Sequence, residues 1–299
     1  MADGYIIDTA DVRKTFGSVQ ALAGLDLRVP RGAICGLLGR NGAGKTTTIK
    51  VLLGMVQPTS GRARVFGLPA TDAKSSIEIR SRAAFVSEDK DLYSGVTVGA
   101  LVRFTAPFYP QWRADRANEY LAAFELRSEA TVKELSRGMR TKLALLLALS
   151  TGGELLILDE PMSGLDPAAI EQVLKIIVKQ AGRDGTTVLF SSHQLADVEQ
   201  IADRVAIVDR GRVVVDGALD DLRAAYRRIQ LVFDGAAPDA KFDSKGVVSV
   251  RREGRVLSVL CQAAETDVVA EARSLNPNAV DVLPVTLKEI FLETVGVEN

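Results

Sequence analysis

The hydrophobic and polar positions of residues 30–215 predict short buried strands that alternate with helices. Three apolar runs have the length of strands that are buried on both faces. A helical pattern, GKTTTIKVLLGM, follows the first run, and RVAIVDRGRVVVDG is typical of a hairpin that turns at Asp209-Arg210-Gly211. Strands that alternate with helices indicate a largely parallel sheet, and therefore an α/β fold. The three runs are Ala33–Leu38, Glu154–Glu160 and Thr186–Ser192.

Two other regions depart from this alternation. At about residues 91–152 helical periodicity replaces the strand pattern, as in TVGALVRFTAPFY and RADRANEYLAAFEL, so we expect an inserted helical lobe. After about Arg228 the order becomes strand, hairpin, helix, strand, helix. We therefore expect two domains: residues 1–227, which include the lobe, and a small α+β domain at residues 228–299.

Composition and charge are those of an ordinary globular protein. The 299 residues are 47% apolar and 25% charged, and the chain is long enough to bury one large core or two smaller ones. The formal net charge is -1. Because this charge provides no general attraction for a polyanion, we expect no nucleic-acid partner.

The sequence predicts neither a secretory signal nor a membrane span. The N-terminal residues lack the basic and apolar pattern of a signal, and no apolar run approaches the roughly 18 residues that a span needs. The longest run, Leu143–Ser150, is typical of a buried core helix. Cys35 and Cys261 lie far apart in apolar surroundings, which fits a reducing compartment. We expect a cytoplasmic protein that reaches a membrane only through a partner.

The segment GRNGAGKTT, Gly39–Thr47, matches the phosphate-binding pattern G-x-x-x-x-G-K-[ST]. Its glycines let backbone N–H groups approach phosphate oxygens, and the N-terminus of the next helix adds a favourable dipole. Lys45 would neutralise the β- and γ-phosphates, and the Thr46 hydroxyl would bind Mg²⁺. The alternative is a glycine-rich turn that contains Gly-Lys-Thr by accident. The strand before the motif and the helix after it favour the phosphate site.

An acidic pair, Asp159 and Glu160, ends the second apolar run. Open α/β sheets bind their ligands at this carboxyl end of the strands. The Asp159 carboxylate suits Mg²⁺, and Glu160 could orient an attacking water or accept its proton. Such a pair is usually only a polar strand end, but a phosphate cradle elsewhere in the chain favours catalysis.

Further motifs resemble, in the same order, those of the ATP-binding subunit of ABC transporters, and they cover most of the first predicted domain. Phe16 lies where that family stacks an aromatic ring on adenine. ELSRGMRTKLALLLAL resembles the signature segment, with Ser136 and Gly138 at the matching positions, and EPMSGLDP resembles the D-loop, with Asp166 at the dimer contact. His193, the only histidine, matches the switch histidine that contacts the γ-phosphate. In isolation, a helix-capping or core role would be the better interpretation of His193, and a simple helix N-cap would be the better interpretation of Ser136.

The resemblance implies a P-loop NTPase core with an antiparallel β subdomain and a helical lobe, and it implies ATP and Mg²⁺ as cofactors. In the family the signature helix of one subunit faces the ATP of another, so one cradle and one signature imply a dimer. The family also implies a separate integral-membrane permease at the inner face of the cell membrane. The residues expected to contact ATP are Phe16, Gly39, Asn41, Gly42, Ala43, Gly44, Lys45, Thr46, Thr47, Ser136, Gly138 and Asp166; those expected to catalyse hydrolysis are Lys45, Glu160 and His193; and those expected to hold Mg²⁺ are Thr46, Glu88 and Asp159.

The chain departs from the family pattern in two places. Glu88 stands where the family has a glutamine, and it offers Mg²⁺ a charged oxygen in place of a neutral one. We expect Glu88 to bind Mg²⁺ and to couple the lobe to the permease; the alternative is a solvated loop residue. In the signature, Arg137 and Met139 replace the usual glycine and glutamine. Arg137 could add a cation near the phosphates of the partner subunit or could point into solvent.

The function predicted from this resemblance is an ATPase that powers a membrane permease, and its C-terminal sequence VTLKEIFLETVG resembles the tails of bacterial antibiotic- and lipid-exporter ATPases. One alternative is a soluble ABC-type ATPase that acts on ribosomes or DNA. The chain has one set of motifs and no sustained heptads, which argues against this class. A second alternative is a nucleotide-bound regulatory module that does not hydrolyse ATP.

Overall fold

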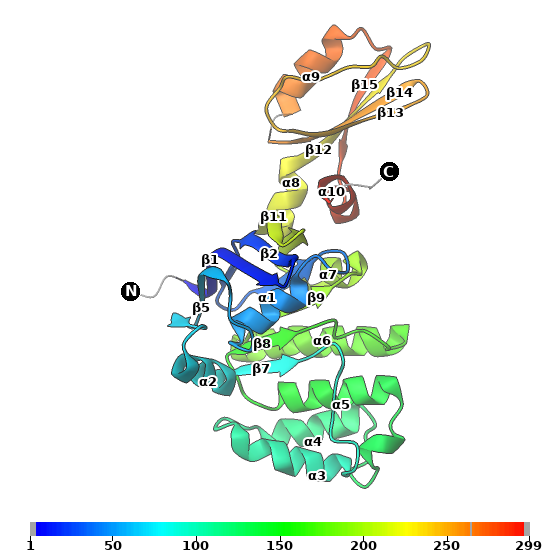
Figure 1. The fold of residues 1–299 in the computed structure, drawn as a ribbon. Coiled ribbons are helices and arrows are strands. Elements are labelled where there is room, and N and C mark those ends of the chain that lie inside the picture. The colour runs from blue at the N-terminus through cyan, green and yellow to red at the C-terminus, as the bar shows by residue number, and fades with distance from the viewer. Residues whose placement is uncertain (1–3, 264, 296–299) are drawn as a thin grey trace. The chain divides into compact units, whose positions relative to one another are not determined.

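In the computed structural model, which describes residues 4–263 and 265–295, three sheets organise the chain (Figure 1). Contacts divide it into two units between Asp216 and Gly217, and each unit has its own core. The boundary expected from the sequence, after residue 227, follows helix α8 (Leu219–Ala225), whereas this division precedes it.

The first sheet of the first unit is antiparallel, with strand order β2-β1-β5-β6 and with β3 paired to β1. Register shifts interrupt its pairs at several points, including Val12/Arg13. This sheet confirms the antiparallel β subdomain that the family resemblance implied. Its strands are β1 (Tyr5–Phe16), β2 (Val19–Leu25), β3 (Arg28–Pro30), β5 (Ser60–Val65) and β6 (Leu68–Pro69).

The second sheet has the order β11-β10-β4-β9-β8-β7, and its five strands from β10 to β7 are parallel. Every residue of β4, β8 and β9 is buried, as expected for strands covered on both faces. The predicted parallel α/β sheet is confirmed. Its strands are β4 (Ile34–Leu38), β7 (Ala83–Val86), β8 (Leu155–Leu158), β9 (Thr187–Ser192), β10 (Arg204–Asp209) and β11 (Arg212–Ala218).

The main core lies between the two sheets, around helix α1 (Lys45–Leu52). Ile49 and Leu52 of α1 belong to the same buried cluster as Leu37 of β4. Helix α7 (Leu195–Ile201) contacts β4 and β9, and a Cβ on Gly36 would lie 2.5 Å from Val198 of that helix. Close packing therefore fixes β4 and α1, which flank the phosphate-binding motif.

Three helices form the inserted lobe, where α5 packs against both α3 and α4 (Figure 1). Helix α5 is buried along nearly all of its second half, as predicted for the apolar run it contains. Short 3-10 turns, η1 (Ala106–Phe108) and η2 (Val132–Glu134), join the elements. The helices of the first unit not yet given bounds are α2 (Ala73–Arg82), α3 (Val98–Thr105), α4 (Ala114–Ala123), α5 (Arg137–Leu149) and α6 (Pro167–Asp184).

The second unit is a four-stranded antiparallel sheet of order β13-β14-β12-β15. Ile229 and Val259 share one sheet face and belong to a buried cluster with Val268 of helix α9. The order of elements agrees with the predicted α+β domain. They are β12 (Tyr226–Val232), β13 (Val247–Glu253), β14 (Val256–Gln262), α9 (Glu265–Ser274), β15 (Ala279–Pro284) and α10 (Leu287–Thr294).

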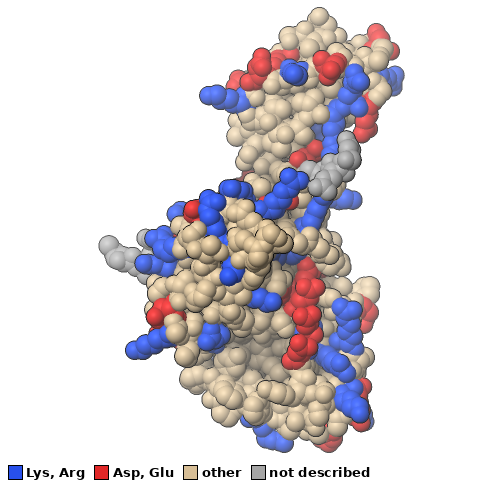
Figure 2. All heavy atoms as spheres, viewed as in Figure 1, with Lys and Arg blue, Asp and Glu red and all other residues tan. Residues whose placement is uncertain are grey.

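Surface properties agree with the composition. Figure 2 shows Lys and Arg side chains together with Asp and Glu side chains on the face in view. Within residues 4–263 and 265–295, no helix combines the length and the apolar character that a membrane crossing requires. Cys35 and Cys261 are both buried and free.

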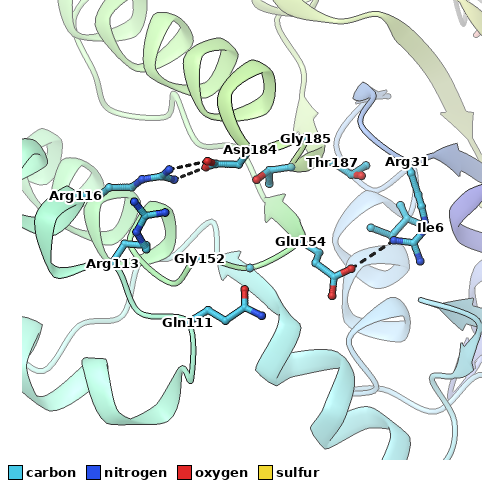
Figure 3. Close-up of a pocket in the computed structure, with 12 residues that line it drawn as sticks. Ile6, Arg31, Gln111, Arg113, Arg116, Gly152, Glu154, Asp184, Gly185 and Thr187 are labelled. Carbon is cyan, nitrogen blue, oxygen red and sulfur yellow. Dashed lines mark hydrogen bonds and ion pairs between the residues drawn. The ribbon is translucent and has the colours of Figure 1, made fainter.

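A buried arginine joins the lobe to helix α6 (Figure 3). Arg116 of α4 is 2% exposed, and its Nη2 donates to Asp184 Oδ1 at 2.7 Å while its Nη1 contacts the other carboxylate oxygen. Nη1 also donates to Gln180 Oε1 at 2.8 Å, and the Tyr120 hydroxyl donates to the same oxygen at 3.1 Å. The pair borders a cavity of about 410 Å³ where β8 and β9 begin, away from their carboxyl ends.

Replacing this arginine should loosen the lobe. Arg116→Met removes the buried donor of Asp184 and one of the two donors of Gln180, so the free energy of unfolding should fall by about 2–4 kcal/mol in denaturant titrations of the full chain. Arg113→Met is the matched control: Arg113 pairs with Asp115 at the surface, so the change should stay within about 0.5 kcal/mol. Equal stability of the two variants would contradict a stabilising role of the buried pair.

Candidate functional site

Three neighbouring strands bring the predicted residues to one edge of the parallel sheet. Strand β9 pairs with β4 on one side and with β8 on the other, and all three are parallel. Their carboxyl ends therefore meet at the same edge, where open α/β sheets bind ligands. Gly39 follows β4, Asp159 follows β8 and His193 follows β9.

The loop between β4 and α1 has the conformation of a phosphate cradle. Gly42 and Gly44 have φ of 81° and 110°, which disfavour any residue with a Cβ. At Gly44, the N-cap of α1, a Cβ would also lie 2.7 Å from the carbonyl oxygen of Ala21. Lys45 is 7% exposed, and its Nζ donates to the Gly39 carbonyl at 2.7 Å. The loop thus holds an ammonium group among backbone groups at a helix N-terminus, which suits phosphate.

The Glu160 carboxylate lies between the Lys45 ammonium group and the His193 ring. Its Oε1 is 3.6 Å from Lys45 Nζ, and its Oε2 is 2.8 Å from His193 Nδ1. The Glu160 side chain is 10% exposed, whereas that of His193 is 53% exposed. Lys45, Glu160 and His193, which lie far apart in the sequence, thus form one cluster. A carboxylate held in this way can orient a water molecule or accept its proton.

Ser191 is a member of this site that was not predicted from the sequence. Ser191 belongs to β9, and its Oγ donates a hydrogen bond to Asp159 Oδ1 at 2.6 Å. The same Oγ accepts a hydrogen bond from the Glu160 N–H at 2.9 Å. One hydroxyl therefore fixes both acidic residues at the end of the neighbouring strand. The only signal in the sequence is a pair of serines at the end of an apolar run, which alone does not predict a contact.

Lys45, Glu160 and His193 line a cavity of about 530 Å³ at the sheet edge, whereas Asp159 and Ser191 are not part of its described lining. Phe16, predicted to stack on adenine, ends β1 and is not part of this described lining; it is 48% exposed, and Lys14 Nζ lies 4.7 Å from its ring centroid. Gly39 and Ala43 belong to the cradle but are not part of the cavity lining. The described lining residues are Val19, Gln20, Ala21, Arg40, Asn41, Gly42, Gly44, Lys45, Thr46, Thr47, Glu88, Glu160 and His193.

The signature residues form a separate structure. Ser136 is the N-cap of α5, and its Oγ accepts the N–H of Met139 at 3.2 Å. A Cβ on Gly138 would lie 3.2 Å from the Gly164 carbonyl oxygen, so the start of α5 packs closely on the D-loop. Arg137 Nη2 donates to Ser163 Oγ at 3.0 Å. Arg137 therefore binds the D-loop of its own chain, an arrangement that the sequence did not indicate.

Asp166 also has a local structural role. It is the N-cap of α6, and its Oδ1 accepts the N–H of Ala169 at 2.9 Å. This backbone hydrogen bond lowers the pKa of the Asp166 carboxyl group. Ser136, Gly138 and Asp166 are absent from the described lining of the 530 Å³ cavity, so their role towards a nucleotide stays a prediction.

The residues predicted to bind Mg²⁺ suit an ion that takes most of its ligands from phosphate and water. The described residues contain no group of three His, Cys, Asp or Glu side chains that could hold a metal by themselves. Thr46 and Glu88 line the cavity, and Asp159 is 1% exposed with one oxygen bound by Ser191. A hydroxyl and carboxylates beside a phosphate cradle are suitable oxygen ligands for Mg²⁺, which also binds phosphate and water.

Known proteins are similar to this chain over nearly its whole length. A family model described as ABC transporter matches residues 22–163. The bacitracin transport ATP-binding protein BcrA of Bacillus licheniformis is 34% identical over 298 residues, covering 96% of this chain and 95% of BcrA. The chain belongs to the ABC transporter ATP-binding protein family.

Two further comparisons support this family. The daunorubicin resistance ATP-binding protein DrrA3 of Streptomyces coeruleorubidus is 35% identical over 314 residues, covering 99% of this chain and 97% of DrrA3. A solved ATP-binding subunit of an ABC transporter has a TM-score of 0.68 at 32% identity, over 73% of this chain and 92% of that one. Because both ABC relatives match nearly the whole chain, the similarity extends beyond residue 163 into the second unit.

The cradle geometry predicts the effect of removing the lysine of this ABC protein. Lys45→Ala removes the buried ammonium group, so ATP should bind about 30–100-fold more weakly, the loss of roughly 2–3 kcal/mol for a charge-assisted contact. Equilibrium binding of ATP to the purified chain measures this. Lys50→Ala, on the exposed side of the same helix, is the control. Unchanged affinity in Lys45→Ala would contradict the phosphate role.

Proposed function

We propose that the chain hydrolyses ATP and thereby powers a separate membrane permease, with two chains closing around two nucleotides. The observation that carries this proposal is the cluster of Lys45, Glu160 and His193 beside a phosphate cradle. A nucleotide-bound regulatory module would need the cradle but would not need a buried carboxylate with a histidine at its side. The arrangement therefore favours ATP hydrolysis over a regulatory role without hydrolysis.

Each side chain of the cluster has a distinct proposed role. Lys45 neutralises the terminal phosphates, for which it must exchange its contact with the Gly39 carbonyl. Glu160 orients the attacking water and accepts its proton, and His193 holds the Glu160 carboxylate and donates to the γ-phosphate. Mg²⁺, when bound, would be held by Thr46, Glu88 and Asp159 and would offset the phosphate charge. The role of Glu88 towards Mg²⁺ stays a prediction.

One observation on the cavity supports the proposed dimer. Its described lining includes no residue of the signature or the D-loop, although Ser136 opens α5 with a hydroxyl and a positive helix end. We propose that this helix end contacts the nucleotide held by a second copy. In this arrangement residues 1–227 form the ATP-binding domain and residues 228–299 form an accessory domain. Closure and reopening of the pair would drive the permease.

Export is the proposed direction. The relatives that match nearly the whole chain are named for bacitracin transport and daunorubicin resistance. Because these names refer to those proteins, the cargo of this chain stays open, but resistance to a drug is consistent with its removal from the cell. Through its permease the chain would lie at the inner face of the membrane.

The central test changes only the proposed base. Glu160→Gln should bind ATP normally, lower the turnover number at least about 100-fold and accumulate an ATP-bound dimer, because the amide cannot accept the proton. Steady-state phosphate release and size measurement with MgATP provide both readouts. Glu171→Gln, at an exposed site of α6, should behave as the unchanged protein. Normal hydrolysis by Glu160→Gln would remove Glu160 from the reaction.

An exposed aromatic cluster supports docking of a membrane partner on the lobe. Tyr93, Phe104 and Phe108 are 68%, 54% and 64% exposed, and their rings meet edge to face at 5.8 and 5.4 Å. Their sequence neighbours Leu92 and Thr105 line a cavity of about 200 Å³, together with other residues of the loop after β7 and of the lobe. Exposed aromatic clusters mark contact sites more often than isolated apolar residues do.

This docking surface gives a second functional prediction. The double variant Phe104→Ser/Phe108→Ser should keep its ATPase activity. Used as bait on detergent-solubilised membranes of the source organism, it should bind at least about 10-fold less permease than the unchanged protein, because aromatic anchors dominate such interfaces. Mass spectrometry identifies and quantifies the integral-membrane protein recovered. Ile77→Ala, an exposed apolar change on α2, is the control. Equal recovery with the double variant would place the partner elsewhere.

A further inference from the structure

Lys90 is a buried lysine whose ammonium group contacts the backbone of the catalytic glutamate. It lies in the loop between β7 and α3, two residues after Glu88, and is 8% exposed. Its Nζ donates to the carbonyl oxygens of Glu160 and Glu88, each at 3.0 Å. Burial lowers the pKa of Lys90. Since lysines are almost never buried without a purpose-built set of partners, this placement requires an explanation.

The Glu160 backbone has an unusual conformation that these contacts stabilise. Its φ is 47°, in the left-handed region, which is unfavourable for a residue with a Cβ. The Glu160 N–H donates to Ser191 Oγ at 2.9 Å, while its carbonyl accepts from Lys90 and from the Ser163 N–H at 3.2 Å. Both of its peptide groups are thus fixed, and Lys90 supplies the only charged donor among these contacts.

Lys90 does not itself face the proposed ATP site. It is absent from the described lining of the 530 Å³ cavity that contains Lys45, and it lines instead the 200 Å³ cavity between its own loop and α5. A lysine placed in this way cannot touch phosphate while it holds the Glu160 carbonyl. Its effect on the reaction therefore passes through the two residues whose carbonyl oxygens it contacts, Glu160 and Glu88.

We propose that Lys90 is a positioning residue that holds Glu160 in the left-handed conformation and makes the placement of its carboxylate depend on the loop that carries Glu88. This inference rests on the proposed ATPase function. The loop leads from β7 to the lobe, so a displacement of the loop changes the Nζ–carbonyl distance. A hydrogen bond loses its geometry beyond about 3.5 Å, and a catalytic group misplaced by about 1 Å can lower the rate about 100-fold.

The first experiment compares Lys90→Met, which keeps an unbranched side chain but removes the terminal ammonium group, with Lys74→Met at an exposed site of α2. In the full chain, Lys90→Met should lower kcat about 10–100-fold while KM and the Kd for ATP change less than about threefold. Lys74→Met should match the unchanged protein. A kcat within twofold of normal in Lys90→Met would overturn the role of Lys90.

Chemical restoration of the ammonium group separates positioning from a general loss of folding. Lys90→Cys should be as slow as Lys90→Met, and treatment with 2-bromoethylamine, which rebuilds a lysine-like side chain, should recover kcat at least about fivefold. The unchanged protein receives the same treatment as a control, because Cys35 and Cys261 are also present. If mass spectrometry confirms the modification and kcat does not recover, Lys90 does not position Glu160.

The two proposals fail in distinguishable ways. If the unchanged protein hydrolyses ATP and all Lys90 variants do so equally well, the positioning role is wrong and the proposed ATPase function stands. If the unchanged protein binds ATP without releasing phosphate, the proposed function is wrong, and the positioning role is overturned with it.

Discussion

The Glu160 carboxylate is buried, and a buried charge is stable only when cations or hydrogen-bond donors surround it. Its neighbours Lys45 and His193 come from two other strand ends, which the parallel order of β4, β9 and β8 brings to one edge. The fully buried strands fix this order, so the core determines the geometry of the charges. The cluster therefore exists only in the folded sheet and at one place on it.

A second set of contacts in the same chain begins at the backbone of Glu160. Arg137 links the start of α5 to Ser163 of the D-loop, and Gly138 allows the close approach of Gly164. The D-loop continues directly from Glu160, whose carbonyl accepts the Ser163 N–H. Glu160, the D-loop and the signature helix are thus parts of one hydrogen-bonded structure. A second chain that contacts the signature helix of this chain would therefore also act on the backbone of Glu160 in this chain, the residue proposed as the base.

Elements that follow strong local rules could be predicted from the amino-acid sequence alone. Strands β4, β8 and β9 lie within the three apolar runs, and Gly39–Thr47 has a fixed spacing of glycines, lysine and threonine. The contacts of Glu160 with Ser191 and Lys90 could not be predicted, because they join residues 31 and 70 positions apart and depend on strand order. The orientation of Arg137 towards Ser163 likewise depends on how α5 packs. Family resemblance supplied the antiparallel sheet, whose irregular strands carry only a weak pattern.

In the proposed dimer, one chain holds half of each ATP site and a second copy completes it. The most direct measurement is the structure of the full chain at saturating Mg²⁺ and a non-hydrolysable ATP analogue. Two chains should lie face to face, with each analogue between Lys45 of one copy and Ser136 of the other. The Glu160 carboxylate should lie near the γ-phosphate. Single chains, or a pair in which Ser136 lies far from every nucleotide, would contradict it.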